Sequence, residues 1–61
     1  MANKKIIMMM LSFGVSIADL ADEFVITDDQ VVDKLNDKMG YKQSFEVMLA
    51  IAEIAKRKDR A

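Results

Sequence analysis

The chain of 61 residues contains no cysteine, histidine, proline or tryptophan. Without cysteine a disulfide scaffold is excluded, and without cysteine and histidine the usual zinc sites and nucleophile and base pairs are excluded as well. The two glycines, Gly14 and Gly40, are too isolated to form a phosphate-binding loop. Asp28, Asp29 and Asp33 lack the spacing and the glycine of an EF-hand calcium loop. We therefore expect no enzyme, no metal site and no cofactor.

A single domain covering residues 1–61 is the only organisation that this length allows. No apolar run approaches the ~18 residues of a membrane span, and the absence of cysteine fits a cytoplasmic protein. The start of the chain also resembles a short signal peptide, with Lys4, Lys5, an apolar run and a small-residue site at Ala18. Cleavage there would cut into an amphipathic segment, so we interpret residues 4–13 as a first helix and expect a cytoplasmic location.

Hydrophobic spacing predicts an all-α fold with four helices. Methionine and leucine favour a helix over residues 4–13, which Gly14 would end as a C-cap. The methionines would fill gaps in the core or form an adaptable surface for partners, and we favour the core. The next two segments repeat apolar residues at helical spacing. They are Ile17, Leu20, Ala21 and Phe24 in the first segment, and Val31, Val32, Leu35 and Met39 in the second.

The corner between these two helices is Val25-Ile26-Thr27, which is too short for anything but a sharp turn. Thr27 is suited to be an N-cap, and Gln30 three residues later completes a capping box. Asp28 and Asp29 would then lie in the first turn, where the helix dipole favours negative charge. We expect this third helix to end at Gly40, with Tyr41 packing back on its last turn.

A fourth helix is predicted to follow Ser44 as its N-cap, and it is apolar on nearly all sides. One stripe consists of Phe45, Met48, Leu49 and Ala52, and a second of Val47, Ile51 and Ile54. Three short neighbours in so small a domain hardly cover both stripes. We therefore expect a homodimer with Val47, Ile51 and Ile54 at its interface; the alternative is a monomer whose core takes both stripes.

Several positions in the first half resemble the helix-turn-helix superfamily, and more loosely LuxR-type and sigma region 4 domains. The matching residues, about a third of the chain, are Gly14-Val15-Ser16, Leu20-Ala21, Phe24, Ile26-Thr27, Val31 and Leu35. The resemblance implies a helix-turn-helix domain with a role in transcription regulation. The family usually has glycine in the turn where this chain has Val25, and a β-branched residue with positive φ would be strained there. Either the corner has another geometry or the likeness to the family is limited.

The residues that the resemblance places toward a partner carry the wrong charge for DNA. They are Thr27, Asp28, Asp29, Val32, Asp33 and Asn36, and none is a cation. Residues 19–37 hold seven acidic residues and one basic residue, whereas DNA affinity comes largely from lysine and arginine. These acids would also suit an ordinary solvated helix face.

Two functional hypotheses follow. In the first, a helix-turn-helix regulator touches DNA through basic terminal segments whose phosphate contacts are Lys4, Lys5, Lys56, Arg57, Lys58 and Arg60. In the second, the domain has no DNA contact, and its acidic helix binds the basic surface of a protein partner. A transcription-linked regulatory role is the interpretation that we favour, with either mode of contact and with no membrane or small-molecule partner.

Overall fold

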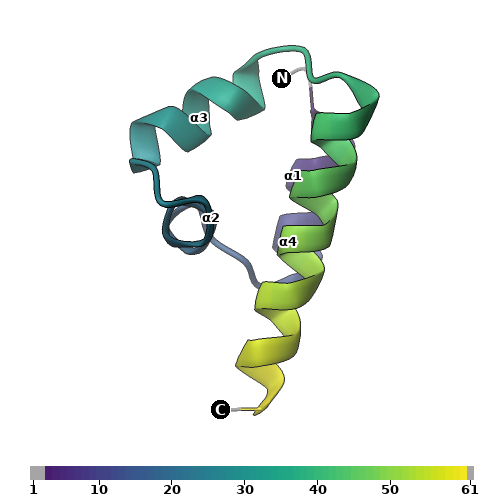
Figure 1. The fold of residues 1–61 in the computed structure, drawn as a ribbon. Helices are drawn as coiled ribbons and strands as arrows, with labels where there is room; N and C mark the ends of the chain where they lie inside the picture. The colour runs from purple at the N-terminus through teal and green to yellow at the C-terminus, as the bar shows by residue number, and fades with distance from the viewer. Residues whose placement is uncertain (1–2, 61) are drawn as a thin grey trace.

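The computed structural model describes residues 3–60, which form four α-helices and no strand. They are α1 (Lys4–Phe13), α2 (Ile17–Phe24), α3 (Asp28–Asn36) and α4 (Tyr41–Arg60). The long α4 runs the height of the molecule with α1 beside it, while α2 and α3 lie on the other side (Figure 1). The all-α, four-helix prediction is confirmed. No helix within residues 3–60 is long and apolar enough to cross a membrane.

The hydrophobic core lies between α4 and the three shorter helices. Leu20 of α2 and Ile51 of α4 are the largest side chains that are fully buried. Their apolar neighbours come from α1, the α1–α2 turn, α3 and α4, and are Ile6, Met10, Val15, Ala21, Val31, Leu35, Val47, Ala50 and Ile54. One stripe of each helix therefore faces a shared core, as the spacing of apolar residues predicts.

Capping boxes begin both helices of the α2–α3 pair. The Thr27 hydroxyl accepts a hydrogen bond from the Gln30 N–H at 3.2 Å, and the Thr27 N–H donates to the Gln30 side chain at 2.9 Å. This is the predicted cap. Ser16 and Asp19 form an equivalent box at the start of α2. Each box satisfies backbone N–H groups that a helix start leaves unpaired, and so fixes where the helix begins.

The corner between α2 and α3 is closed by Val25 in a left-handed conformation, with φ 56° and ψ 50°. The N–H of Ile26 donates to the Ala21 carbonyl at 2.9 Å, and the N–H of Val25 donates to the Asp22 carbonyl. This is the Schellman pattern, and Gly14 ends α1 in the same way, as predicted. Val25 therefore adopts the conformation of a glycine, although its branched side chain makes that conformation unfavourable.

The boundary between α3 and α4 differs from the prediction. α3 ends at Asn36 rather than at Gly40, because a distant side chain takes carbonyls near its end. The Asn3 amide donates to the carbonyls of Leu35 and Asp37, both at 2.7 Å. The last carbonyls of a helix have no intrahelical donor, and the Asn3 amide supplies a donor to the Leu35 carbonyl at this end of α3.

The start of α4 also lies earlier than predicted. The helix begins at Tyr41, and Ser44 lies inside its first turn, where its N–H donates to the Gly40 carbonyl at 3.0 Å. Ser44 is therefore not the N-cap. Tyr41 is 93% exposed and does not pack back on α3. With α3 ending early, residues 37–40 suffice as a connection, and nothing in the sequence from Tyr41 to Ser44 opposes a helix.

Replacing Val25 by glycine is expected to stabilise the protein. The Val25 side chain is 89% exposed, so little packing is lost, and glycine removes a left-handed strain of about 1 kcal/mol. Urea unfolding should show a gain of about that size. Val25→Ala is the matched control, because alanine shortens the side chain but keeps the Cβ atom. Equal effects of the two substitutions, or a loss of stability with glycine, would contradict the strain assigned to this corner.

Candidate functional site

The outer surface of α3 brings together the predicted partner-binding residues. Val31 and Leu35 turn one side of α3 into the core, and the opposite side faces solvent. We call this solvent-facing side the acidic surface of α3; its residues are Thr27, Asp28, Asp29, Val32, Asp33 and Asn36. All are exposed except Val32, which is half-buried between the acidic side chains and the core. Within residues 3–60 no ion pair joins these carboxylates to a cation.

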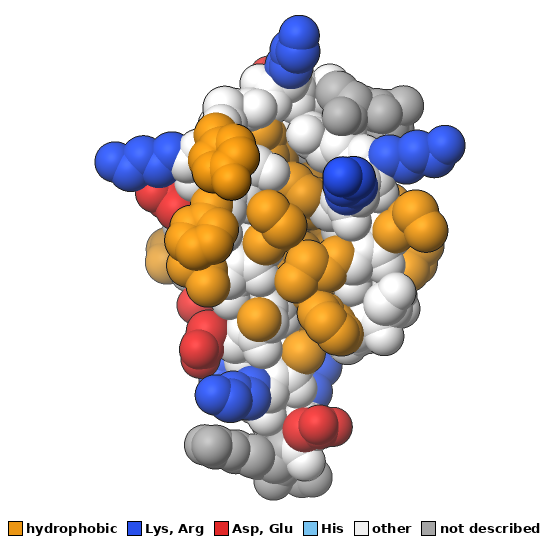
Figure 2. All heavy atoms as spheres, turned by 90° about the vertical axis from the view of Figure 1, so that its right-hand side faces the viewer, with side chains coloured by type: hydrophobic (Ala, Val, Ile, Leu, Met, Phe, Trp, Pro, Cys, Tyr) orange, Lys and Arg blue, Asp and Glu red, His pale blue; other side chains and the backbone are white. Residues whose placement is uncertain are grey.

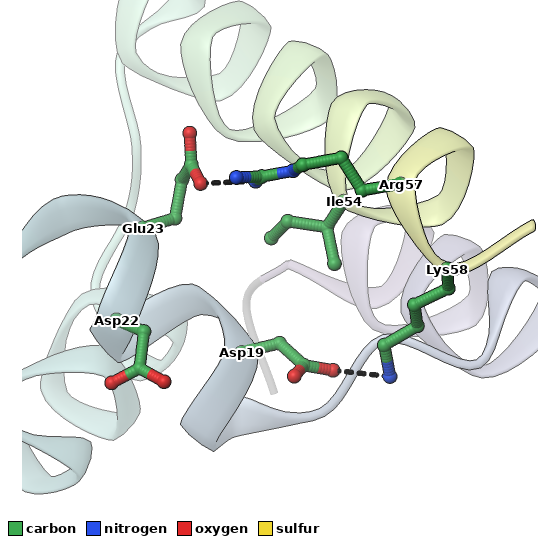
Figure 3. A pocket seen from close by; sticks show the side chains of 6 residues that line it. All are labelled: Asp19, Asp22, Glu23, Ile54, Arg57 and Lys58. Carbon is green, nitrogen blue, oxygen red and sulfur yellow. Dashed lines mark hydrogen bonds and ion pairs between the residues drawn. The ribbon is translucent and has the colours of Figure 1, made fainter. Parts of the chain in front are cut away.

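Two of the predicted phosphate-contacting cations are instead bound to α2. Arg57 pairs with Glu23, and the Lys58 ammonium lies 2.7 Å from the Asp19 carboxylate (Figure 3). The Lys58 ammonium also donates to the Gly14 carbonyl at 2.9 Å. Asp19 and Glu23 are one helical turn apart on α2, and Arg57 and Lys58 are adjacent on α4. The end of α4 is thereby fastened to α2, and these two positive charges are neutralised within the chain.

This contact perturbs the charges that form it. The hydrogen bond from Lys58 and the backbone N–H of Ser16 lower the pKa of Asp19 from 3.8 to about 2. The hydrogen bond to Glu23 raises the pKa of Arg57 above its ordinary value. All four charged groups remain accessible to solvent, which screens the attraction between them. The α2–α4 contact therefore positions the helices more than it adds to the free energy of folding.

The remaining predicted phosphate contacts lie far apart. Lys4 and Lys5 are exposed at the start of α1, which lies near the start of α4, whereas Lys56 is exposed near the far end of α4 (Figure 1). The side chain of Arg60 lies outside the described part of the chain. The structure therefore does not gather these lysines into one basic surface.

The predicted dimer interface is wrong in its residues. Val47, Ile51 and Ile54 are exposed by only 6%, 0% and 6%, so they are core residues of a single chain. Two of the short helices, α1 and α2, pack directly against α4 and cover this stripe. Phe45 and Leu49 of the other stripe stay about half exposed. Interface contacts through the buried stripe would require the core to open.

A hollow of about 360 Å³ between α2 and α4 is lined by the paired charges. Its lining residues are Asp19, Asp22, Glu23, Ile54, Arg57 and Lys58 (Figure 3). Its two cations are held by Glu23 and Asp19, and Asp22 is a third carboxylate in its lining. Across residues 3–60 no three acidic side chains are grouped so that they could hold a metal ion.

Comparison with known proteins gives no matching family model, no matching curated protein and no matching solved structure. The resemblance to helix-turn-helix domains therefore stays a prediction from the sequence. The geometry of the site is the basis for any functional assignment.

Removal of the Lys58 charge is expected to raise the pKa of Asp19 partway from about 2 toward 3.8, since the Ser16 N–H remains. In the wild type, the stabilisation from this carboxylate is complete above about pH 4 and is lost as the pH falls toward 2. In Lys58→Met, the free energy of unfolding should therefore fall less between about pH 4 and pH 2 than it does in the wild type. The carboxyl carbon of Asp19, followed by NMR between pH 1.5 and 6, reports the pKa directly.

Lys56→Met is the matched control, because it removes a neighbouring cation for which no ion pair is present in the described part of the chain. It should leave the Asp19 pKa close to its wild-type value. An Asp19 pKa that is the same with and without Lys58 would contradict the contact.

Proposed function

We propose that this chain is a small non-enzymatic regulatory domain that uses the acidic surface of α3 to bind a basic surface of a protein partner. The observation that carries the proposal is the outward placement of Asp28, Asp29 and Asp33 while Arg57 and Lys58 are bound to α2. The side of the domain formed by α3 is therefore negative overall, because α3 itself carries a single basic residue, Lys34, and Arg57 and Lys58 are held at α2.

The same arrangement argues against insertion of α3 into a DNA groove. Phosphate groups line both sides of the groove, and three carboxylates brought between them would be repelled. Arg57 and Lys58 would have to leave Glu23 and Asp19 before they could hold phosphates. A protein surface rich in arginine has the opposite preference, because each guanidinium can bind a carboxylate through two parallel hydrogen bonds.

Val32 gives the acidic surface a small apolar centre. Its side chain is half-buried, and exposed Asp28, Asp29 and Asn36 lie on the same side of the helix. Protein interfaces commonly combine a desolvated apolar centre with a polar rim that sets orientation and association rate. A basic partner with an apolar side chain among its cations would match both features.

DNA binding is the second candidate function, and it is the one that the resemblance to helix-turn-helix domains favours. It would use Lys4, Lys5 and Lys56, which are exposed. A dimer would present two copies of each lysine and so multiply weak phosphate contacts. Either function would suit a regulator of transcription, a role that rests on the resemblance alone.

The test uses two probes, a protein partner and duplex DNA, and double variants of the domain. Proteins retained by the immobilised domain are identified, purified and titrated against it, and mixed-sequence duplex DNA is titrated in parallel at low salt. Asp28→Lys with Asp33→Lys should weaken binding of the purified protein at least tenfold, and wild-type affinity should fall as salt rises. Glu46→Lys with Asp59→Lys is the matched control, because it reverses two exposed carboxylates outside α3.

Equal losses in the two double variants would contradict the proposed surface. The DNA function would be established in its place if the wild type bound duplex DNA and the double variant Lys56→Ala with Arg57→Ala bound it more weakly. The affinity of that variant should also depend less steeply on salt concentration.

A further inference from the structure

The outer face of α4 is an apolar surface that the fold leaves uncovered. We define it by Tyr41, Phe45, Leu49 and Ala52, which recur at helical spacing opposite the buried stripe of the helix. Tyr41, Phe45 and Leu49 are exposed by 93%, 55% and 52%. Seen from this side, hydrophobic side chains gather along α4 and α1, with charged side chains mostly at the edges and basic atoms also between the two helices in the upper part of the face (Figure 2).

We propose that the outer face of α4 is the contact between two copies of this chain, paired antiparallel about a two-fold axis. Large aromatic side chains anchor many protein interfaces, because they bury much area at little cost in conformational freedom. Here two aromatic residues and a leucine lie in one row on a rigid helix of 20 residues. When a second copy is placed antiparallel, this row of residues packs against the same row of the partner, and both rows become buried.

Charge spacing along the border of this face selects the antiparallel pairing. Lys42, Glu46 and Glu53 lie along one border of the outer face, because they are separated by four and seven residues. About a midpoint between Phe45 and Leu49, Lys42 lies five residues before and Glu53 six residues after. In an antiparallel helix pair related by a two-fold axis, each border of one helix lies beside the same border of the partner helix, and the two borders run in opposite directions. Each Lys42 then lies beside the partner's Glu53, and this ion pair occurs twice. Glu46 lies one residue from the midpoint, so the two copies of Glu46 come close to each other at the axis, and the two ion pairs outnumber this single like-charge contact.

Side-chain size fits the same register to within one residue. Phe45 meets the partner's Leu49, and the bulky Tyr41 meets the small Ala52 of the partner subunit. Two helix surfaces interdigitate well when a large side chain on one helix packs against a small side chain on the other. A parallel pair would instead place the charged border against the partner's α1. The matched charges would then be separated, so the parallel arrangement lacks the ion pairs.

The available area suits a dimer of modest affinity. A stable interface covers about 800 Å² on each partner, which is about a sixth of the 4602 Å² accessible surface of this chain. The molecule measures 33 × 21 × 18 Å, so most of the length of α4 and the adjoining part of α1 must take part. α3 lies on the other side of the molecule (Figure 1), so the dimer leaves both acidic surfaces free.

Sedimentation equilibrium from about 1 to 300 micromolar measures the association directly. The wild type should dimerise with a Kd in the micromolar range. Leu49→Glu should raise the Kd at least tenfold, with helix content by circular dichroism unchanged. Leu11→Glu is the matched control, because this exposed leucine lines a different hollow with Ile17 and Leu35. It should leave the Kd within about threefold of the wild-type value.

A charge reversal tests the antiparallel register. Lys42→Glu and Glu53→Lys should each raise the Kd about tenfold, because each places like charges together in both copies of the pair. The double variant exchanges the two charges and should return the Kd to within about threefold of wild type. A wild type that stays monomeric throughout, or a double variant no better than the two single variants, would overturn the proposal.

Discussion

The fold depends on one constraint: α4 is apolar on nearly all sides, but the chain has only three short helices with which to cover it. α1 and α2 pack against α4 directly, and α3 is held mainly through α2. These helices bury a single stripe of α4, with Ile51 fully inaccessible at its centre. Much of the apolar surface on the opposite side of α4 stays in solvent. The division of α4 into a covered and an uncovered side determines where the rest of the molecule can interact.

The covered side of α4 also determines which way the α2–α3 pair faces. Leu20 and Ala21 pack α2 into the core, and the turn at Val25 then carries the chain steeply away into α3 (Figure 1). Arg57 and Lys58 fasten the outer edge of α2 to the end of α4. As a result Arg57 and Lys58 are bound to α2, and the acids of α3 face out.

Much of this arrangement could be predicted from local sequence. The apolar spacing of α1, α2 and α3, the left-handed Gly14 and the Thr27–Gln30 box depend on residues within a few positions of one another. Such interactions can be predicted from a sequence, because helix caps and amphipathic helix faces depend on residues that are close together in the chain. The acidic surface of α3 was predictable for the same reason.

Features that depend on distant residues could not be predicted. Asn3 ends α3 through hydrogen bonds that span more than 30 residues, so the helix boundary could not be read from residues 36–44. The pairing of Arg57 with Glu23 is equally remote in sequence. Both stripes of α4 have good helical spacing, and only the packing of α1 and α2 decides that Ile51 is buried and Leu49 is not.

The most direct test of this account compares the two sides of α4 in the free energy of unfolding. Ile51→Ala and Leu49→Ala each shorten an aliphatic side chain, and urea unfolding at about 1 micromolar keeps the chain dilute. We expect Ile51→Ala to lower the unfolding free energy by about 2 to 5 kcal/mol, or to prevent folding altogether. Leu49→Ala should change it by less than about 1 kcal/mol. Comparable losses at the two positions would contradict the division of α4 into a core side and an uncovered side.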